Sequence, residues 1–283
     1  MSLGGTARAA SRTPQRGNDV TRALADLERE HGARLGVFAR NTLTGAQVVH
    51  RAKELFPICS VHKIMTVAAV LRDLDRDGEF LARRIHYTGK DVAAAGYAPI
   101  TGTPEHLAAG MTIAELCAAA LDHSDNAADN LLLRELGGPA AITRFCRSVG
   151  DGVTRLDRRE PALNSAEPGR VTDTTSPAAI ARTLTDLVLG AALAPRDRWQ
   201  LTEWLLANTT GAARLRAGLP PHWALADKTG TGSYGTTNDV GIAWTTDGTP
   251  LVLSVLSTKA NADATADEPL IARTAALLVP ALC

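Results

Sequence analysis

The sequence is poor in aromatic residues and has no excess of charge of either sign. Phe, Trp and Tyr make up 4% of the 283 residues, and 30 basic side chains balance 30 acidic ones. Nucleic-acid-binding proteins usually carry a basic surface, often with aromatic side chains that stack on bases. The composition therefore argues against nucleic acid as a partner.

Long apolar runs are also lacking. No stretch approaches the roughly 18 apolar residues that a membrane-spanning helix needs, so we expect no membrane span. Residues 1–19 are rich in Gly, Ala, Ser, Thr and Arg and contain no apolar core of a signal peptide. We expect residues 1–17 to form a flexible N-terminal tail, and the missing signal does not by itself indicate a cytoplasmic protein.

Cysteine is scarce, and its spacing matches no metal-binding pattern. Cys59, Cys117, Cys146 and Cys283 form no C-x-x-C pair and no Cys/His zinc motif. We therefore predict no metal and no cofactor. Two interpretations of the cysteines remain open: small buried apolar side chains, or a disulfide such as Cys117–Cys146.

What is present are strand patterns at both ends of the chain and helical patterns between them. Apolar Leu35, Val37 and Ala39 occupy alternate positions, and the Thr44-Gly45 turn leads to a second run at 47–50, which predicts a β-hairpin. Short apolar runs recur at 224–228, 239–245 and 251–257, with an Asp247-Gly248 turn between the last two. Helical spacing is found over 20–31 (capped by Asn18-Asp19), 60–71, 112–135, 176–187, 199–207 and 268–282.

This order predicts an α+β fold: a three-layer α/β/α sandwich with an antiparallel sheet, plus an inserted all-α lobe. The discontinuous α/β domain comprises residues 18–55 and 208–283. The all-α domain comprises residues 56–207. A cleft between two such lobes is a natural ligand site.

Two short motifs within the helical region point to nucleophilic chemistry. Ser60 lies in the first turn of a predicted helix, where the Lys63 amine can reach its hydroxyl, and a serine needs such a base to attack. Ser124-Asp125-Asn126 interrupts an apolar helical stretch, so Ser124 could relay a proton and Asn126 could bind an amide. Taken alone, each also fits an ordinary helix cap.

Two further motifs complete the set. Lys228-Thr229-Gly230-Thr231 follows an apolar run, and a lysine with hydroxyls on a strand edge can hold a carboxylate. Glu160, in a loop with Asn164, could hold and deprotonate a water. Taken alone, the lysine motif also fits a β-hairpin turn, and the segment with Glu160 also fits an ordinary acidic loop.

Together and in this order, the four motifs resemble the class A serine β-lactamases from about Asp19 to the C-terminus. The resemblance implies the β-lactamase/D,D-peptidase-like fold and hydrolysis of the β-lactam amide of penicillins, and plausibly cephalosporins, through a Ser60 acyl-enzyme. It implies that Glu160 and Asn164 activate the deacylating water. Whether Lys63 or Glu160 accepts the Ser60 proton during acylation stays open.

The resemblance also assigns roles to the remaining residues. Ser124 protonates the leaving nitrogen, and the backbone N–H groups of Ser60 and Thr231 form the oxyanion hole. Arg158 and Asp173 form an ion pair that anchors the loop carrying Glu160. The residues expected to contact substrate are Tyr97, Asn126, Asn164, Arg214, Lys228, Thr229, Gly230 and Thr231.

Some positions depart from the common pattern of that family. Many members carry an arginine on the strand after the lysine motif; residues 235–238 contain none, and Arg214 matches an arginine that other members use instead. A cysteine at the position of Cys59 is bridged in carbapenem-hydrolysing members, but its partner position here is Gly232, which argues against strong carbapenemase activity. We interpret His62 as a packing residue and not as a base.

The alternatives are a penicillin-binding D,D-peptidase and a β-lactam-sensing receptor domain, with a related esterase as a weaker third. Glu160 with Asn164 argues against the first two, because a protein without a water-activating pair keeps its acyl group. For an esterase, the Ser60–Lys63 motif without this loop would fit better. We expect a monomer that acts on small β-lactam molecules, and that is secreted or located in the cell envelope.

Overall fold

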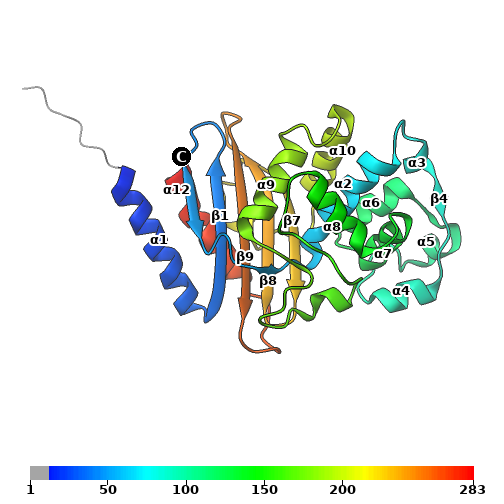
Figure 1. Ribbon diagram of the computed structural model, residues 1–283, viewed down its shortest axis with the longest axis horizontal. Coiled ribbons are helices and arrows are strands. Elements are labelled where there is room, and N and C mark those ends of the chain that lie inside the picture. The colour runs from blue at the N-terminus through cyan, green and yellow to red at the C-terminus, as the bar shows by residue number, and fades with distance from the viewer. Residues whose placement is uncertain (1–12) are drawn as a thin grey trace, which may run out of the picture.

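The computed structural model describes the backbone of residues 13–283 and the side chains of residues 19–283. Five strands form one antiparallel sheet in the order β2-β1-β9-β8-β7. They are β1 (Ala33–Asn41), β2 (Gln47–His50), β7 (Ala224–Gly232), β8 (Thr236–Trp244) and β9 (Pro250–Lys259). The predicted antiparallel sheet built from both ends of the chain is confirmed, and β7 is one of its edges (Figure 1).

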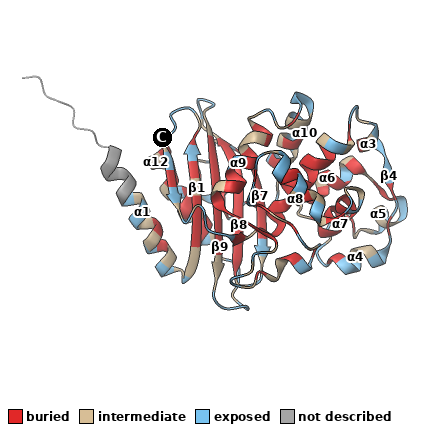
Figure 2. Cartoon of the chain, in the orientation of Figure 1, coloured by how far each residue is buried: buried red, intermediate tan, exposed pale blue. Residues whose placement is uncertain are grey.

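Helices cover both faces of this sheet. α1 (Thr13–Glu30) and α12 (Glu268–Leu282) pack on one face, and α9 (Pro177–Val188) packs against β1, β8 and β9 on the other. With both faces covered, β8 and β9 are buried along most of their length instead of alternating, as the red strands of Figure 2 show. The α+β fold class is therefore confirmed.

Most of the remaining helices gather beyond β7 (Figure 1). They are α2 (Lys63–Ala69), α3 (Glu79–Ala82), α4 (Gly89–Ala95), α5 (Pro104–Ala109), α6 (Ile113–Asp122), α7 (Asn126–Glu135), α8 (Pro139–Ser148) and α10 (Pro195–Leu206). The short helix α11 (Leu215–Gly218) packs instead against α12. Short elements join them: the 3₁₀ turns η1 (Cys59–His62) and η3 (Ala162–Ser165), the π-helical turn η2 (Val70–Leu74), and the two-residue strands β3 (Phe56–Pro57), β4 (Arg84–Ile85), β5 (Met111–Thr112) and β6 (Thr174–Thr175).

Sequence signals explain where several of these helices begin. Thr112 and Glu115 form a reciprocal capping box at the start of α6. Ser176 caps α9, whose first residue is Pro177. Asp125 caps α7 by accepting a hydrogen bond from the Ala128 N–H.

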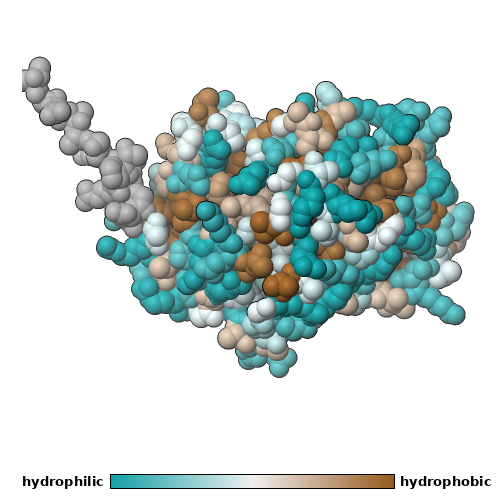
Figure 3. Space-filling view, viewed as in Figure 1, coloured by the Kyte–Doolittle hydropathy of each residue, from teal (hydrophilic) through white to brown (hydrophobic). Residues whose placement is uncertain are grey.

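Two apolar cores lie on the two sides of the sheet. One, between the sheet and helices α1 and α12, includes Leu24, Leu35 and Leu278. The other joins the opposite sheet face to the helical region, with α2 and α6 at its centre. The outer surface in Figure 3 is mostly hydrophilic, with small apolar groups near its middle.

Several predicted details are wrong. Helix α1 begins at Thr13, so Asn18 and Asp19 lie within it and do not cap it. Residues 13–17 of the predicted tail therefore belong to this helix, and residues 1–12 lie outside the described residues. The helix predicted over 60–71 starts as a 3₁₀ turn and ends in a π-helical turn.

The cysteines resolve the open alternative. All four are free, so the Cys117–Cys146 disulfide does not form. Cys59, Cys117 and Cys146 are buried, as the first interpretation predicts, but Cys283 is exposed.

The division into domains needs one qualification. Helix α9 lies within residues 56–207, the predicted all-α domain, yet it covers the sheet. We keep the two-domain division as a proposal, with α9 as the element that belongs to both. Among the described residues, no helix has the length and apolarity that crossing a bilayer requires.

Candidate active site

Ser60 lies in the 3₁₀ turn η1, directly before helix α2. The preceding residue, Cys59, has a φ of 47°, a left-handed conformation that few non-glycine residues adopt. The turn places the Ser60 hydroxyl next to the Lys63 amine, and Lys63 Nζ donates a hydrogen bond to Ser60 Oγ at 3.0 Å. Ser60 is 7% exposed, so its hydroxyl is largely shielded yet still reaches the surface.

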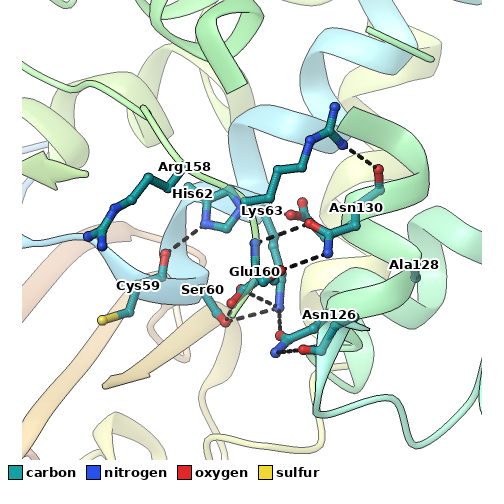
Figure 4. A network of polar contacts seen from close by, with 12 residues as sticks. Cys59, Ser60, His62, Lys63, Asn126, Ala128, Asn130, Arg158 and Glu160 are labelled. Carbon is teal, nitrogen blue, oxygen red and sulfur yellow. Dashed lines mark hydrogen bonds and ion pairs between the residues drawn. The ribbon is translucent and has the colours of Figure 1, made fainter. Parts of the chain in front are cut away.

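Lys63 connects the nucleophile turn to two other segments (Figure 4). Its Nζ lies 2.8 Å from the Ser124 carbonyl oxygen and 2.7 Å from Asn126 Oδ1. It also forms an ion pair with Glu160 Oε1 at 3.1 Å. Because Lys63 is fully buried, the Glu160 carboxylate is the group that balances its charge.

The Ser124-Asp125-Asn126 motif is both a helix cap and a part of the site. Asp125 caps α7 as an ordinary N-cap, and its other oxygen accepts the Thr101 N–H at 2.8 Å. Ser124 has a φ of 57°, and its Oγ lies 3.4 Å from Lys63 Nζ. The cap therefore holds Ser124 and Asn126 in position beside the nucleophile.

The loop after Arg158 brings Glu160 into the same site. Ser60 Oγ donates to Glu160 Oε1 at 3.2 Å, and Asn164 Nδ2 donates to Glu160 Oε2. Asn130, on α7, fixes the backbone at Glu160: its side chain donates to the Glu160 carbonyl at 2.9 Å and accepts the Glu160 N–H at 3.1 Å. The sequence analysis missed Asn130; its position four residues after Asn126, on the same helix face, is the signal that could have found it.

Arg158 and Asp173 lie behind the loop and not in the cleft. Arg158 Nε donates to Asp173 Oδ2 at 2.6 Å. The other oxygen of Asp173 accepts the N–H groups of Asp157 at 2.8 Å and Arg158 at 2.9 Å. The expected ion pair is therefore present, and Asp173 also orders the backbone where the loop begins.

The lysine motif lies within β7, so the hairpin-turn alternative for it is wrong; the turn follows, at residues 233–235. Lys228 is fully buried, and its Nζ donates to the Thr229 carbonyl at 3.1 Å. Burial, with the nearby Lys63 charge, lowers the pKa of Lys228 to about 7.

Gly230 packs closely against the nucleophile turn. A Cβ atom there would lie 3.1 Å from the Ile58 carbonyl oxygen and 3.2 Å from both Cys59 Cβ and Val61 Cγ2. A residue without a side chain at this position thus lets β7 approach the turn that holds Ser60.

Arg214 is not a surface arginine. It is 5% exposed, and its guanidinium donates to Thr231 Oγ1 at 2.7 Å and to the Gly230 and Asn238 carbonyls at 3.0 and 2.9 Å. Glu268 lies 3.3 Å from its Nε. Arg214 therefore adds positive charge beneath the end of β7.

These segments enclose a cleft of about 350 Å³. It is lined by Ser60, Tyr97, Ser124, Asn126, Asn164, Thr210, Arg214, Thr229, Gly230 and Thr231. Larger hollows of about 970 and 750 Å³ elsewhere contain none of the predicted site residues. Thr210, whose hydroxyl bonds that of Thr229, is a lining residue that no sequence motif indicated.

Comparison with known proteins then assigns the family. A sequence model described as "Beta-lactamase enzyme family" matches residues 19–282. The chain belongs to this β-lactamase family. A β-lactamase of Streptomyces lavendulae is 63% identical over 282 residues, covering 100% of this chain and 92% of the relative. The β-lactamase OXY-1 of Klebsiella oxytoca is 45% identical and covers 93% and 89%, respectively.

A solved β-lactamase structure supports the same assignment. The β-lactamase from Streptomyces albus G superimposes with a TM-score of 0.93 at 62% identity, covering 94% of this chain and 100% of that one. The predicted class A β-lactamase, its fold and its hydrolase activity on β-lactams are thereby confirmed.

Proposed function

We propose that this β-lactamase works through a Ser60 acyl-enzyme that Glu160 helps to hydrolyse. One observation carries the proposal: three reactive atoms form a closed triangle. Ser60 Oγ lies 3.0 Å from Lys63 Nζ and 3.2 Å from Glu160 Oε1, and the latter two lie 3.1 Å apart. The serine proton can therefore pass to Glu160 directly, or to Lys63 once the Lys63 amine has given up a proton of its own.

Acylation uses this triangle and the end of β7. Ser60 Oγ attacks the lactam carbonyl carbon while its proton passes to Glu160, or to Lys63 when that amine is neutral; both groups lie within reach of the hydroxyl. The N–H groups of Ser60 and Thr231 donate to the developing oxyanion. The C–N bond then breaks, and Ser124 supplies the proton that the leaving nitrogen needs, with Lys63 3.4 Å away to replace it.

Deacylation uses the opposite side of the site. Glu160 Oε2 accepts a hydrogen bond from Asn164 Nδ2, whereas the buried Oδ1 of Asn164 accepts none from the described residues. A water bound between the two side chains would donate to both oxygens. Glu160 removes its proton, the water oxygen attacks the ester carbonyl, and Ser60 leaves with a proton restored to its hydroxyl.

Substrate binding follows from charge. The substrate carboxylate binds at the end of β7, where Lys228, Thr229 and Thr231 offer one ammonium and two hydroxyl groups and Arg214 adds a second cation. Asn126 contacts the side-chain amide, and Tyr97, which is 56% exposed, forms a wall at the cleft rim. Penicillins are the proposed substrates, with cephalosporins as a second class.

We propose further that the enzyme is a monomer without a nucleic-acid partner and that it is secreted or located in the cell envelope. The zero formal charge supports the absence of a nucleic-acid partner, and the resemblance to class A enzymes supports the location.

Turnover and acyl-enzyme mass test the mechanism. With a chromogenic cephalosporin, the protein should show many turnovers, Ser60→Ala should form no adduct, and Glu160→Ala should accumulate one adduct per molecule. Glu167→Ala is the matched control, because Glu167 lies on the same loop with its side chain 45% exposed. Normal turnover by Glu160→Ala would refute its role, and a persistent adduct on the unmodified protein would favour a peptidase or receptor.

A further inference from the structure

His62 has a place in the site that the mechanism above does not use. Its side chain is completely buried, between Ser60 and Lys63 in sequence. Nδ1 lies 2.8 Å from the Cys59 carbonyl oxygen, a contact drawn in Figure 4, and Nε2 lies 2.8 Å from Asp129 Oδ2. Asp129, on α7, is equally buried.

The two partners determine the protonation of this ring. A carbonyl oxygen can only accept a hydrogen bond, and so can an ionised carboxylate. When the Asp129 carboxyl is ionised, both ring nitrogens donate, and His62 is then an imidazolium paired with that carboxylate.

The surrounding charges favour the same state. Burial opposes a charged ring, but the Asp129 carboxylate, with Glu160 beyond it, raises the pKa of His62 above its ordinary value, against the effect of Lys63. Burial also opposes a charged Asp129, yet His62 keeps the pKa of that carboxyl below its ordinary value. The positive charges of His62 and Lys63 thus balance the negative charges of Asp129 and Glu160.

The Cys59 carbonyl and the Ser60 N–H belong to one peptide unit. In a trans peptide the two groups point in opposite directions, so a donor behind the turn acts on the N–H that faces the cleft. A hydrogen bond from a cation to the carbonyl oxygen draws electron density from the nitrogen and strengthens the N–H as a donor. It also fixes the orientation of a peptide that follows the left-handed Cys59 residue.

We propose that His62, held as a cation by Asp129, is a positioning residue of the oxyanion hole: it donates to the Cys59 carbonyl and so orients and polarises the Ser60 N–H. The inference rests on the proposed function, because it takes that N–H to be one of the two oxyanion donors. Lys63 and Glu160 move protons; His62 sets the strength of a donor and exchanges no proton in the cycle.

A double variant, His62→Phe with Asp129→Leu, removes both charges together. Replacing a buried ion pair by apolar residues of similar volume is often neutral for stability, so the variant should fold. Asp129→Asn keeps the partner but removes its charge, which leaves His62 neutral with Nδ1–H still able to donate. Thr183→Val is the control: it removes a buried 2.9 Å hydrogen bond from Thr183, on α9, to Asp151.

Two measurements follow acylation in a Glu160→Ala background, where the adduct persists. We expect the double variant to acylate about tenfold more slowly, less than the loss caused by deleting a donor, and its ester carbonyl stretch to move to higher frequency. Asp129→Asn should give an intermediate shift, and Thr183→Val none. An unchanged acylation rate and carbonyl frequency in the folded double variant would overturn the proposal.

A third measurement needs no adduct and therefore separates this inference from the mechanism. Nitrogen-15 NMR of the free enzyme should show both His62 ring nitrogens protonated at pH 7, and the Ser60 amide proton should move upfield in the double variant. A neutral His62 ring, or a Ser60 amide that does not respond, would refute the inference even if Ser60 and Glu160 act as proposed. Failure of Glu160→Ala to accumulate adduct would refute the mechanism but leave the NMR result to decide on His62.

Discussion

Replacing Asp173 by asparagine should uncouple the loop carrying Glu160 from the rest of the site. Asp173 is 1% exposed, and its carboxylate accepts three hydrogen bonds: the Asp157 N–H at 2.8 Å, the Arg158 N–H at 2.9 Å and Arg158 Nε at 2.6 Å. Glu160 lies two residues after Arg158, so this anchor supports the chain next to it, in addition to the two hydrogen bonds between Asn130 and the Glu160 backbone. The substitution therefore changes one buried group without touching the reactive atoms.

The cost follows from these contacts. An asparagine oxygen can still accept the two backbone N–H groups, but its NH₂ group then faces Arg158 Nε, a donor against a donor. Losing one hydrogen bond between charged groups costs about 1.5–3 kcal/mol, and a buried donor without an acceptor costs about 1 kcal/mol or more. We expect the free energy of unfolding to fall by about 3 kcal/mol, at the lower end for a broken buried pair because the Arg158 side chain is 25% exposed.

Catalysis should fall more than stability suggests. A displacement of about 1 Å at a reacting group can cost about 100-fold in rate, so kcat should fall by about that factor while acyl-enzyme accumulates. Urea unfolding, steady-state hydrolysis and intact mass together measure these effects. Arg155→Gln is the control, because Arg155 forms only an exposed pair with Asp157 and should change neither value. An Asp173→Asn variant with normal kcat and no adduct would refute the anchoring role.

Three further outcomes are expected. Because Lys228 has a pKa of about 7, it is charged below pH 7 and neutral above it in the free enzyme, so kcat/KM should fall as the pH rises through 7. Lys228→Arg should abolish that alkaline fall. A flat wild-type profile of kcat/KM from pH 6 to 9 would contradict the prediction. Gly36→Ala would bring a Cβ within 2.5 Å of the Phe56 ring and should lower the free energy of unfolding by about 2 kcal/mol in urea titrations, whereas unchanged stability would show that the ring moves freely. Asp125→Ala removes the α7 cap and the acceptor of the buried Thr101 N–H, so about 4 kcal/mol of stability should be lost; a loss below 1 kcal/mol in the same titration would argue against the cap.

The fold was predictable where the information is local. Alternating Leu35, Val37 and Ala39 predicted β1, and Asp247-Gly248 predicted the turn between β8 and β9. The pairing of β1 with β9 could not be predicted in this way. It joins residues more than 200 positions apart and depends on how distant segments pack together. Helix α9 illustrates the same limit: its periodicity indicates one buried face but does not tell that this face covers the sheet.

The site divides in the same way. Its reactive groups lie in short motifs, so Ser60 and Glu160 could be predicted before their 3.2 Å contact was known. The groups that position them were harder to predict. Asn130 shares a helix face with Asn126, but its contact with Glu160, like that of Asp129 with His62, is tertiary. The start of α1 at Thr13 was missed for another reason: the Asn18-Asp19 pair resembles a cap, but the helix already extends before it.

The C-terminal half of the sheet also positions the nucleophile. Asn238, on β8, donates from Nδ2 to the Pro57 carbonyl at 2.9 Å and to the Ile58 carbonyl at 3.2 Å, and Gly230 on β7 packs against the same turn without a side chain between them. The two proposed oxyanion donors, the N–H groups of Ser60 and Thr231, belong to these two touching segments. Their separation is therefore set by backbone contact across the junction of sheet and helices, which explains why the cleft lies at the β7 edge and not in the larger hollows elsewhere.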